Sequence, residues 1–186
     1  MTTQPIGESK MTFGPYPDGH CFYIEKSATY QKIQQGVKMA EFLLLRFSHG
    51  KPPVVWVVEA KESAPHPETE GDETKAGFDK FIADVREKLV NAFSLCVASC
   101  LKRHAQAEEE LPEPYKALDL SDVGVRFVLV IKNHKDDWLD PIRDALRKSF
   151  QATVKTWALS PTSVVVLNEV LARQHGLILS ANGRIT

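Results

Sequence analysis

Apolar residues along the chain follow two spacings, which predict strands and helices in a mixed order. Short runs rich in β-branched, aromatic and leucine residues predict strands over residues 21–25, 36–47, 53–61, 125–131 and 163–167. Apolar residues at three- and four-residue steps predict a long helix over residues 78–101 and a second over about 136–154. Asn168 is placed to cap a short last helix that ends at Gly176.

This order of elements predicts a single α/β domain over residues 20–186. The first three strands are closely joined, so we expect an antiparallel meander, whereas the helix-linked later strands should run parallel through right-handed crossovers. The result is a mixed sheet flanked by helices. Residues 1–19 contain many turn-forming residues and few periodic apolar positions, which predicts an irregular lead-in.

Composition narrows the class of protein. A chain of 186 residues with 43% hydrophobic and 25% charged residues is typical of one globular domain. No apolar run approaches the roughly 18–20 residues of a membrane helix, and the first residues lack the pattern of a secretory signal. Three cysteines at unrelated spacings favour buried thiols over disulfides or a metal site. We therefore expect a cytoplasmic protein without a membrane partner.

Two carboxylates and an ammonium group are predicted to meet on the hairpin of the second and third strands. A turn near Gly50 places Glu41 directly opposite Glu59, with both side chains on the same face of the sheet. Lys61 shares that face because strand side chains alternate with a period of two. Facing acids are destabilising unless a proton or a cation lies between them.

A hard divalent cation would relieve this repulsion and supply a hydrolytic chemistry. Mg2+ is commonly held by one or two carboxylates together with water and substrate phosphate, and it lowers the pKa of bound water. Lys61 would then orient the water or stabilise the charge that develops on the phosphate. The pattern Glu-x-Lys occurs three times in the chain, but only Glu59-Ala60-Lys61 ends an apolar strand and has an acid in register.

Glu41 together with Glu59-Ala60-Lys61 resembles the motif of the PD-(D/E)XK, or restriction-endonuclease-like, nuclease superfamily. The resemblance implies an αβββαβ core and a nuclease that hydrolyses phosphodiester bonds, with DNA as the expected substrate. It implies Mg2+ or Mn2+ as the cofactor, ligated by Glu41, Glu59 and the carbonyl group of Ala60, with Lys61 at the water. Glu25 corresponds to a further upstream acid that assists the metal in this family.

Contacts with nucleic acid would require cations around this centre. The candidates are Lys26, Lys38, Lys132, His134 and Lys135. Lys and Arg together number 23 against 24 acidic residues, so the sequence shows no basic groove. We therefore expect a protein partner or a second copy of the chain to supply further contacts with the nucleic acid.

Two structural interpretations stay open. Glu59 and Lys61 could form a weak surface ion pair, and Glu25 could be a structural acid as readily as a ligand. The alternative function is a catalytically inactive module that keeps the nuclease fold and mediates protein–protein interaction in a defence, repair or mobile-element complex. Its acidic segments over residues 62–74 and 106–113 would then face the partner. No motif of an NTPase, a dinucleotide-binding protein or an α/β-hydrolase is present.

Overall fold

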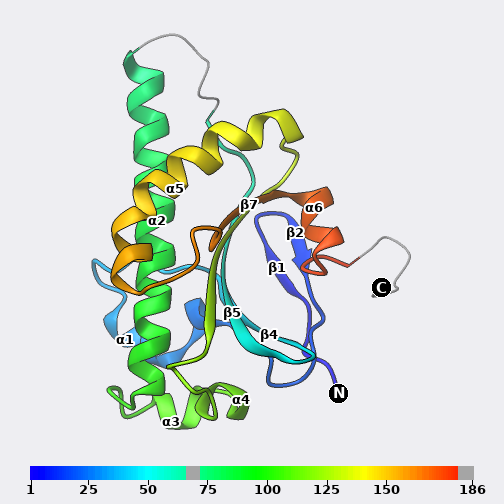
Figure 1. Cartoon of the computed structure of the whole chain (residues 1–186), viewed down its shortest axis with the longest axis vertical. Coiled ribbons are helices and arrows are strands. Elements are labelled where there is room, and N and C mark those ends of the chain that lie inside the picture. The colour runs from blue at the N-terminus through cyan, green and yellow to red at the C-terminus, as the bar shows by residue number, and fades with distance from the viewer. Residues whose placement is uncertain (66–71, 180–186) are drawn as a thin grey trace.

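A mixed five-stranded sheet forms the middle layer of the computed structural model, which describes residues 1–65 and 72–179 (Figure 1). The strands lie in the order in which they occur along the chain: β3 (Cys21–Phe22), β4 (Phe42–Ser48), β5 (Lys51–Lys61), β6 (Gly124–Ile131) and β7 (Val164–Asn168). The pairs β3–β4 and β4–β5 are antiparallel, and the pairs β5–β6 and β6–β7 are parallel. The predicted meander followed by parallel strands is confirmed.

The register of the β4–β5 hairpin is the one that the sequence predicts. Phe42 pairs with Val58, and the pairing continues to Arg46 opposite Val54, with an irregularity before the turn. Gly50 has a φ of +69°, which a glycine adopts without steric cost. Just before β4 begins, the Glu41 N–H donates to the Val58 carbonyl at 3.1 Å. This contact extends the pairing toward Glu41 and Glu59.

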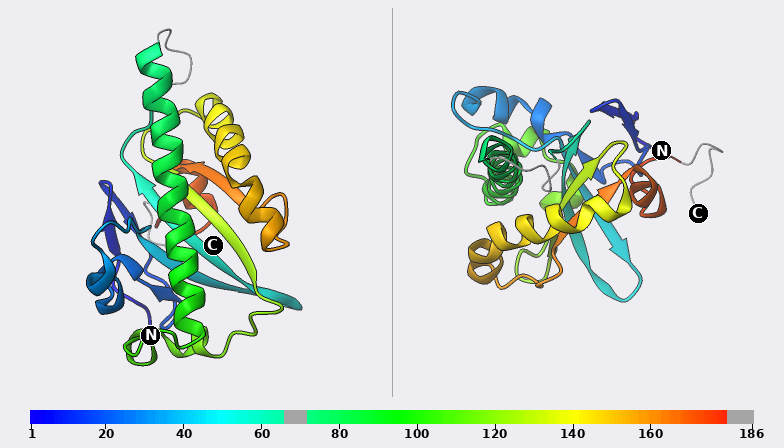
Figure 2. Two further views of the ribbon diagram at one scale, coloured as in Figure 1. Left: turned by 90° about the vertical axis from the view of Figure 1, so that its left-hand side faces the viewer. Right: turned by 90° about the horizontal axis from the view of Figure 1, so that it is seen from above.

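Two helices cover one face of the sheet (Figures 1 and 2). These are α2 (Asp72–Cys100) and α5 (Leu139–Thr156), the latter preceded by the 3-10 turn η2 (Asp136–Trp138). Their apolar stripes bury side chains such as Leu89 and Phe150 against Val57 and Phe127 of the sheet. The helix α1 (Ala28–Ile33) follows the 3-10 turn η1 (Ile24–Lys26) beside this layer. Burial of this apolar surface is the main stabilising contribution to the fold.

A hairpin formed by the first residues covers the opposite face, together with α6 (Glu169–Gln174). The prediction of an irregular lead-in over residues 1–19 was wrong here, because β1 (Ile6–Glu8) and β2 (Met11–Phe13) pair in antiparallel fashion. Their turn is made by Ser9 and Lys10, both with positive φ, which is uncommon for residues other than glycine. Two three-residue strands are too short to show a period in the sequence, and they are stabilised by packing on the sheet.

The remaining differences concern element boundaries. Glu25 lies in η1 and not in a strand, and β4 starts at Phe42 instead of residue 36. The acidic segment after α2 forms the short helices α3 (Ala107–Glu110) and α4 (Glu113–Lys116). The acidic segment over residues 62–74, which has the composition of an exposed loop, falls partly outside the described residues, and α2 already begins at Asp72. None of the helices in the described part of the chain is long and apolar enough to cross a membrane.

The aromatic core under the helices provides a test of this packing. Phe127 is fully buried, and its ring lies 4.5 Å from that of Phe150 and 5.6 Å from that of Phe93. We expect Phe127→Ala to lower the free energy of unfolding by about 3–5 kcal/mol, because it removes buried apolar contacts and leaves a cavity. Urea denaturation followed by circular dichroism measures this. Phe47→Ala, at an exposed position of β4, is the matched control and should cost far less.

Candidate functional site

Glu59 and Lys61 lie near the carboxyl end of β5, on the face that α2 covers. The Glu59 side chain is fully buried, and its Oε1 lies 2.7 Å from the Lys61 Nζ. Glu41 is 5% exposed and lies on the neighbouring strand segment. The interpretation as a weak surface ion pair is therefore wrong, because one of its members has no exposed surface.

A second lysine reaches the same carboxylates from the helix above. The Nζ of Lys88, on α2, lies 2.9 Å from Glu59 Oε1 and 3.9 Å from Glu41 Oε1. Lys88 was not among the residues predicted from the sequence. Lys88 directly precedes the buried Leu89 in a stripe of apolar residues, which is a weak signal because lysine stems often lie along apolar surface. Only the packing of α2 on the sheet identifies its partners.

Three carboxylates converge next to this ion-pair network, and we call Glu8, Glu25 and Glu41 the acidic cluster. One carboxylate oxygen from each lies within 4.8 Å of the others. The backbone holds two of them together, because the Glu25 N–H donates to the Glu41 carbonyl at 3.2 Å. Glu8 arrives from the end of β1, where its carboxylate accepts a hydrogen bond from the Tyr23 hydroxyl. The sequence pattern predicts Glu25 and Glu41 at one site but does not indicate Glu8, because it shows no strand before residue 20.

The electrostatics of these groups reflect burial and mutual repulsion. Burial, followed by the charges of Glu59, Glu25 and Glu8, raises the pKa of Glu41 to about 8, although the positive charge of Lys88 opposes this shift. Burial and the charge of Glu25 also raise the pKa of Glu8. For Lys88, burial lowers the pKa, but attraction to Glu59 and Glu41 outweighs it and the net pKa lies above its ordinary value. The site therefore favours bound positive charge.

The donor set fits a hard divalent cation. The acidic cluster offers only carboxylate oxygens, which Mg2+ and Mn2+ prefer. In addition, Glu41 Oε2 and Glu59 Oε2 are buried and accept no hydrogen bond from the described residues. Such atoms are costly to leave without a partner. The predicted ligands Glu25 and Glu41 are thus brought together with Glu8, while Glu59 lies beside them and is paired with Lys61 and Lys88.

The carbonyl group of Ala60 is the remaining predicted ligand. Ala60 lies between Glu59 and Lys61 on β5. Its carbonyl oxygen accepts a hydrogen bond from the Ser9 hydroxyl at 3.0 Å. Ser9 belongs to the β1–β2 turn, so the hairpin touches the Glu59-Ala60-Lys61 segment directly. A carbonyl oxygen has a second lone pair, and this contact leaves that lone pair available.

The lysines predicted to contact nucleic acid are distributed unequally around the site. Lys132 follows β6, where its N–H donates to the Lys61 carbonyl at 2.9 Å, and its Nζ donates to the Lys10 carbonyl. Lys26 is exposed beside Glu25 of the acidic cluster. Lys38, in contrast, is held by Asp84 and Glu87 on the outside of α2. Lys132 and Lys26 are therefore the better placed of these three.

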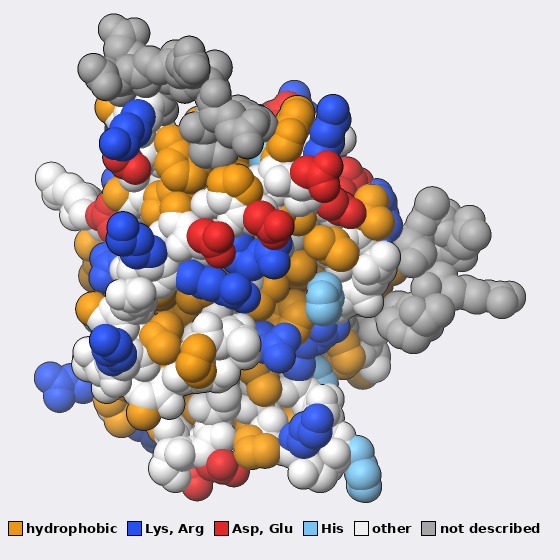
Figure 3. Space-filling model, turned by 45° about the horizontal axis from the view of Figure 1, so that its top comes forward, with side chains coloured by type: hydrophobic (Ala, Val, Ile, Leu, Met, Phe, Trp, Pro, Cys, Tyr) orange, Lys and Arg blue, Asp and Glu red, His pale blue; other side chains and the backbone are white. Residues whose placement is uncertain are grey.

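The two predicted contact residues that follow Lys132 also differ in exposure. His134 is only 9% exposed and packs on the Trp138 ring, so it is poorly placed to touch a phosphate. Lys135 is exposed, with its Nζ 4.8 Å from the centre of the same ring. Figure 3 brings the end of the molecule with the start of α2 forward, and shows Lys and Arg side chains gathered near the middle of this face with acidic side chains beside them.

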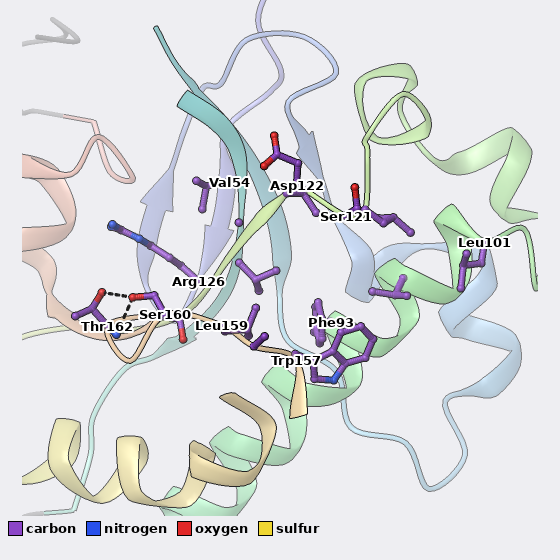
Figure 4. A pocket seen from close by; sticks show the side chains of 17 residues that line it. Val54, Phe93, Leu101, Ser121, Asp122, Arg126, Trp157, Leu159, Ser160 and Thr162 are labelled. Atoms are coloured by element: carbon purple, nitrogen blue, oxygen red, sulfur yellow. Dashed lines mark hydrogen bonds between the residues drawn. The ribbon is translucent and has the colours of Figure 1, made fainter. Parts of the chain in front are cut away.

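A separate pocket of about 670 Å³ lies at the opposite end of β6 (Figure 4). Its walls are mostly apolar, with Phe93, Leu159 and the half-exposed Trp157 among the lining residues. None of the carboxylates described above lines it. The pocket is therefore not part of the candidate site.

The chain matches no protein-family model, no curated protein and no solved structure. Its function therefore has to be inferred from the chemistry of the site itself.

Lys88 should be essential for stability because it neutralises buried carboxylates. We expect Lys88→Ala to lower the free energy of unfolding by about 3 kcal/mol, since it leaves the buried Glu59 charge with only the partly exposed Lys61 as a partner. Urea denaturation near pH 7 measures the change. Lys80→Ala, at an exposed position of the same helix, should change the stability by less than about 0.5 kcal/mol. Equal effects of the two substitutions would contradict the ion-pair network.

The raised pKa of Glu41 predicts a pH dependence of stability in the metal-free protein. Between pH 4.5, its ordinary value, and about 8, the folded state holds a proton that the unfolded state has lost. The contribution of Glu41 to the free energy of unfolding should therefore fall as the pH rises through this window and level off above it. Glu41→Gln should remove this part of the slope when unfolding is measured with EDTA from pH 5 to 9. The exposed control Glu109→Gln should leave the slope unchanged.

Proposed function

We propose that this protein is a metal-dependent nuclease of the PD-(D/E)XK type that hydrolyses phosphodiester bonds, with DNA as the substrate. The observation that supports this most directly is the buried Glu59 paired with Lys61, with Glu41 just before the adjacent strand β4 and two further carboxylates beside Glu41. The order of an antiparallel meander, a helix and parallel strands is also compatible with that fold.

The acidic cluster would hold the divalent cation. Glu8, Glu25 and Glu41 provide the oxygen ligands, and the unpaired Oε2 of Glu59 offers a further one nearby. Once bound, Mg2+ or Mn2+ lowers the pKa of a water molecule and offsets the negative charge of the phosphate group. The high pKa of Glu41 means that protons compete with the cation at neutral pH.

Lys61 is suited to act on the substrate because it is both anchored and accessible. Its Nζ is held 2.7 Å from Glu59, and its side chain is 29% exposed. An ammonium group fixed in this way stabilises negative charge on a phosphate without reorganising during the reaction. Lys88 is more deeply placed and pairs with both Glu59 and Glu41, so its role is to position those carboxylates.

A non-catalytic interaction module is the second candidate function. The observation that favours it is that Glu59 already has two lysine partners, which compensate its charge without a metal. In a module of this kind the ion pairs would be purely structural. Divalent cations would then change neither stability nor activity.

A cleavage assay distinguishes the two functions. We expect the wild-type protein to nick or cleave plasmid or single-stranded DNA with Mn2+ or Mg2+ and to lose this activity in EDTA. Glu59→Gln and Lys61→Ala should each reduce the rate by about 100-fold or more, the range expected when a positioned acid–base or charge-stabilising group is removed. Thermal unfolding of each variant separates lost catalysis from lost folding.

The control for this assay is Glu62→Gln, which changes an exposed acid next to the motif and should keep full activity. Equal cleavage by all variants would point to a contaminating nuclease. Absence of cleavage, together with no stabilisation by Mn2+, would overturn the proposal in favour of the interaction module.

A further inference from the structure

Two arginines lie over one tryptophan ring on the face of the sheet opposite Glu59 and α2. The guanidinium carbon of Arg46, on β4, lies 4.6 Å from the centre of the Trp56 ring, and that of Arg126, on β6, lies 5.4 Å from it. The His175 ring, just after α6, lies 5.9 Å from the same ring. We call these four residues the arginine cluster.

The arginine cluster has no acidic counterpart in the described part of the chain. No carboxylate lies within ion-pair distance of either guanidinium group there. Burial lowers the pKa of Arg46, and the charge of Arg126 lowers it further. Burial and both guanidinium groups likewise lower the pKa of His175. Arg46, Arg126 and His175 therefore lie close enough for their positive charges to repel one another.

The two guanidinium groups are held in place but remain partly accessible. Arg46 donates a hydrogen bond from Nη1 to the His175 carbonyl at 2.6 Å and stacks on Trp56, which limits its motion. Both arginines are half-buried, and His175 is exposed. Arg126 also lines the pocket at the end of β6, and in Figure 4 its side chain points away from Phe93 and Trp157. Stacked guanidinium groups lose little freedom when they bind an anion.

We propose that the arginine cluster is a binding site for a phosphate group. Each planar guanidinium group offers paired N–H donors, which match the oxygens of a phosphate group. Trp56 is only 5% exposed, so it serves as a support for the arginines and offers no surface for stacking a base. The site therefore recognises the phosphate itself.

The phosphate site is separate from the candidate metal site. Trp56 and Glu59 are three residues apart on β5, so their side chains project from opposite faces of the sheet. Trp56 packs with the β1–β2 side of the molecule, whereas Glu59 meets Lys88 of α2. The phosphate could belong to a small phosphate compound or to a nucleic-acid backbone, and these two sources require separate probes.

Titration in EDTA tests the proposal without any contribution from bound metal. We expect inorganic phosphate, a single-stranded DNA oligonucleotide, or both, to bind saturably at low ionic strength and to shift the indole N–H resonance of Trp56. Arg126→Gln should weaken this binding at least tenfold, and Arg126→Lys should restore it only in part. Arg126 is the preferred position because the described residues provide it with no hydrogen-bond partner that its loss would leave unpaired.

Arg86→Gln is the matched control. Its guanidinium group also lies over an aromatic ring, that of Phe150 at 6.0 Å, but it has no second arginine on that ring. This variant has the same change in net charge and should bind both probes like the wild type. Binding of phosphate alone would identify a small phosphate compound as the ligand, and tighter binding of the oligonucleotide would identify a backbone phosphate.

Failure of both probes to bind, or binding that Arg126→Gln leaves unchanged, would overturn the phosphate site. Failure here is distinguishable from failure of the nuclease proposal, since Glu59→Gln should abolish cleavage while leaving phosphate binding in EDTA intact. Conversely, a protein that lacks nuclease activity can still show binding that depends on Arg126.

Discussion

The buried carboxylate of Glu59 is the constraint on which the site depends. A fully buried acid must be compensated, and here Lys61 on the same strand and Lys88 on α2 compensate it from two directions. Because Lys88 lies on the helix that covers the sheet, the ion pairs and the packing of α2 require each other. The apolar contacts of α2 hold Lys88 in place, and Lys88 allows a charged residue to remain inside the core.

The same arrangement explains why the carboxylates gather at one end of the sheet. Glu41 is fixed by the pairing of β4 and β5, Glu25 by its backbone contact with Glu41, and Glu8 by the hairpin that closes the other face. Three elements distant in sequence therefore contribute one acid each. Burial, followed by the charges of Glu59, Glu25 and Glu8, raises the pKa of Glu41, and the gathered carboxylates favour bound cations. A cation site is the simplest chemical use of that preference.

The distribution of charge also separates the two faces of the sheet. The face under α2 bears carboxylates at the carboxyl end of β5, and the opposite face bears Arg46 and Arg126 around Trp56. Both sites follow from side-chain alternation along β5, since one strand directs successive residues to opposite faces. A single strand thus positions an acidic centre and a basic one without bringing them into contact. The nearly neutral net charge of the chain conceals both.

The sequence by itself determined the order of the main elements, the mixed topology and the β4–β5 register. These features depend on local periodicity and on short connections, both of which are visible along the chain. It also predicted that Glu41, Glu59 and Lys61 lie together, because acids that interrupt apolar strands are conspicuous. Only the tertiary structure decided that the first residues form a hairpin and that Glu8 and Lys88 join the site. Those contacts link residues far apart in sequence, and their free energy comes from packing and charge pairing that no local pattern encodes.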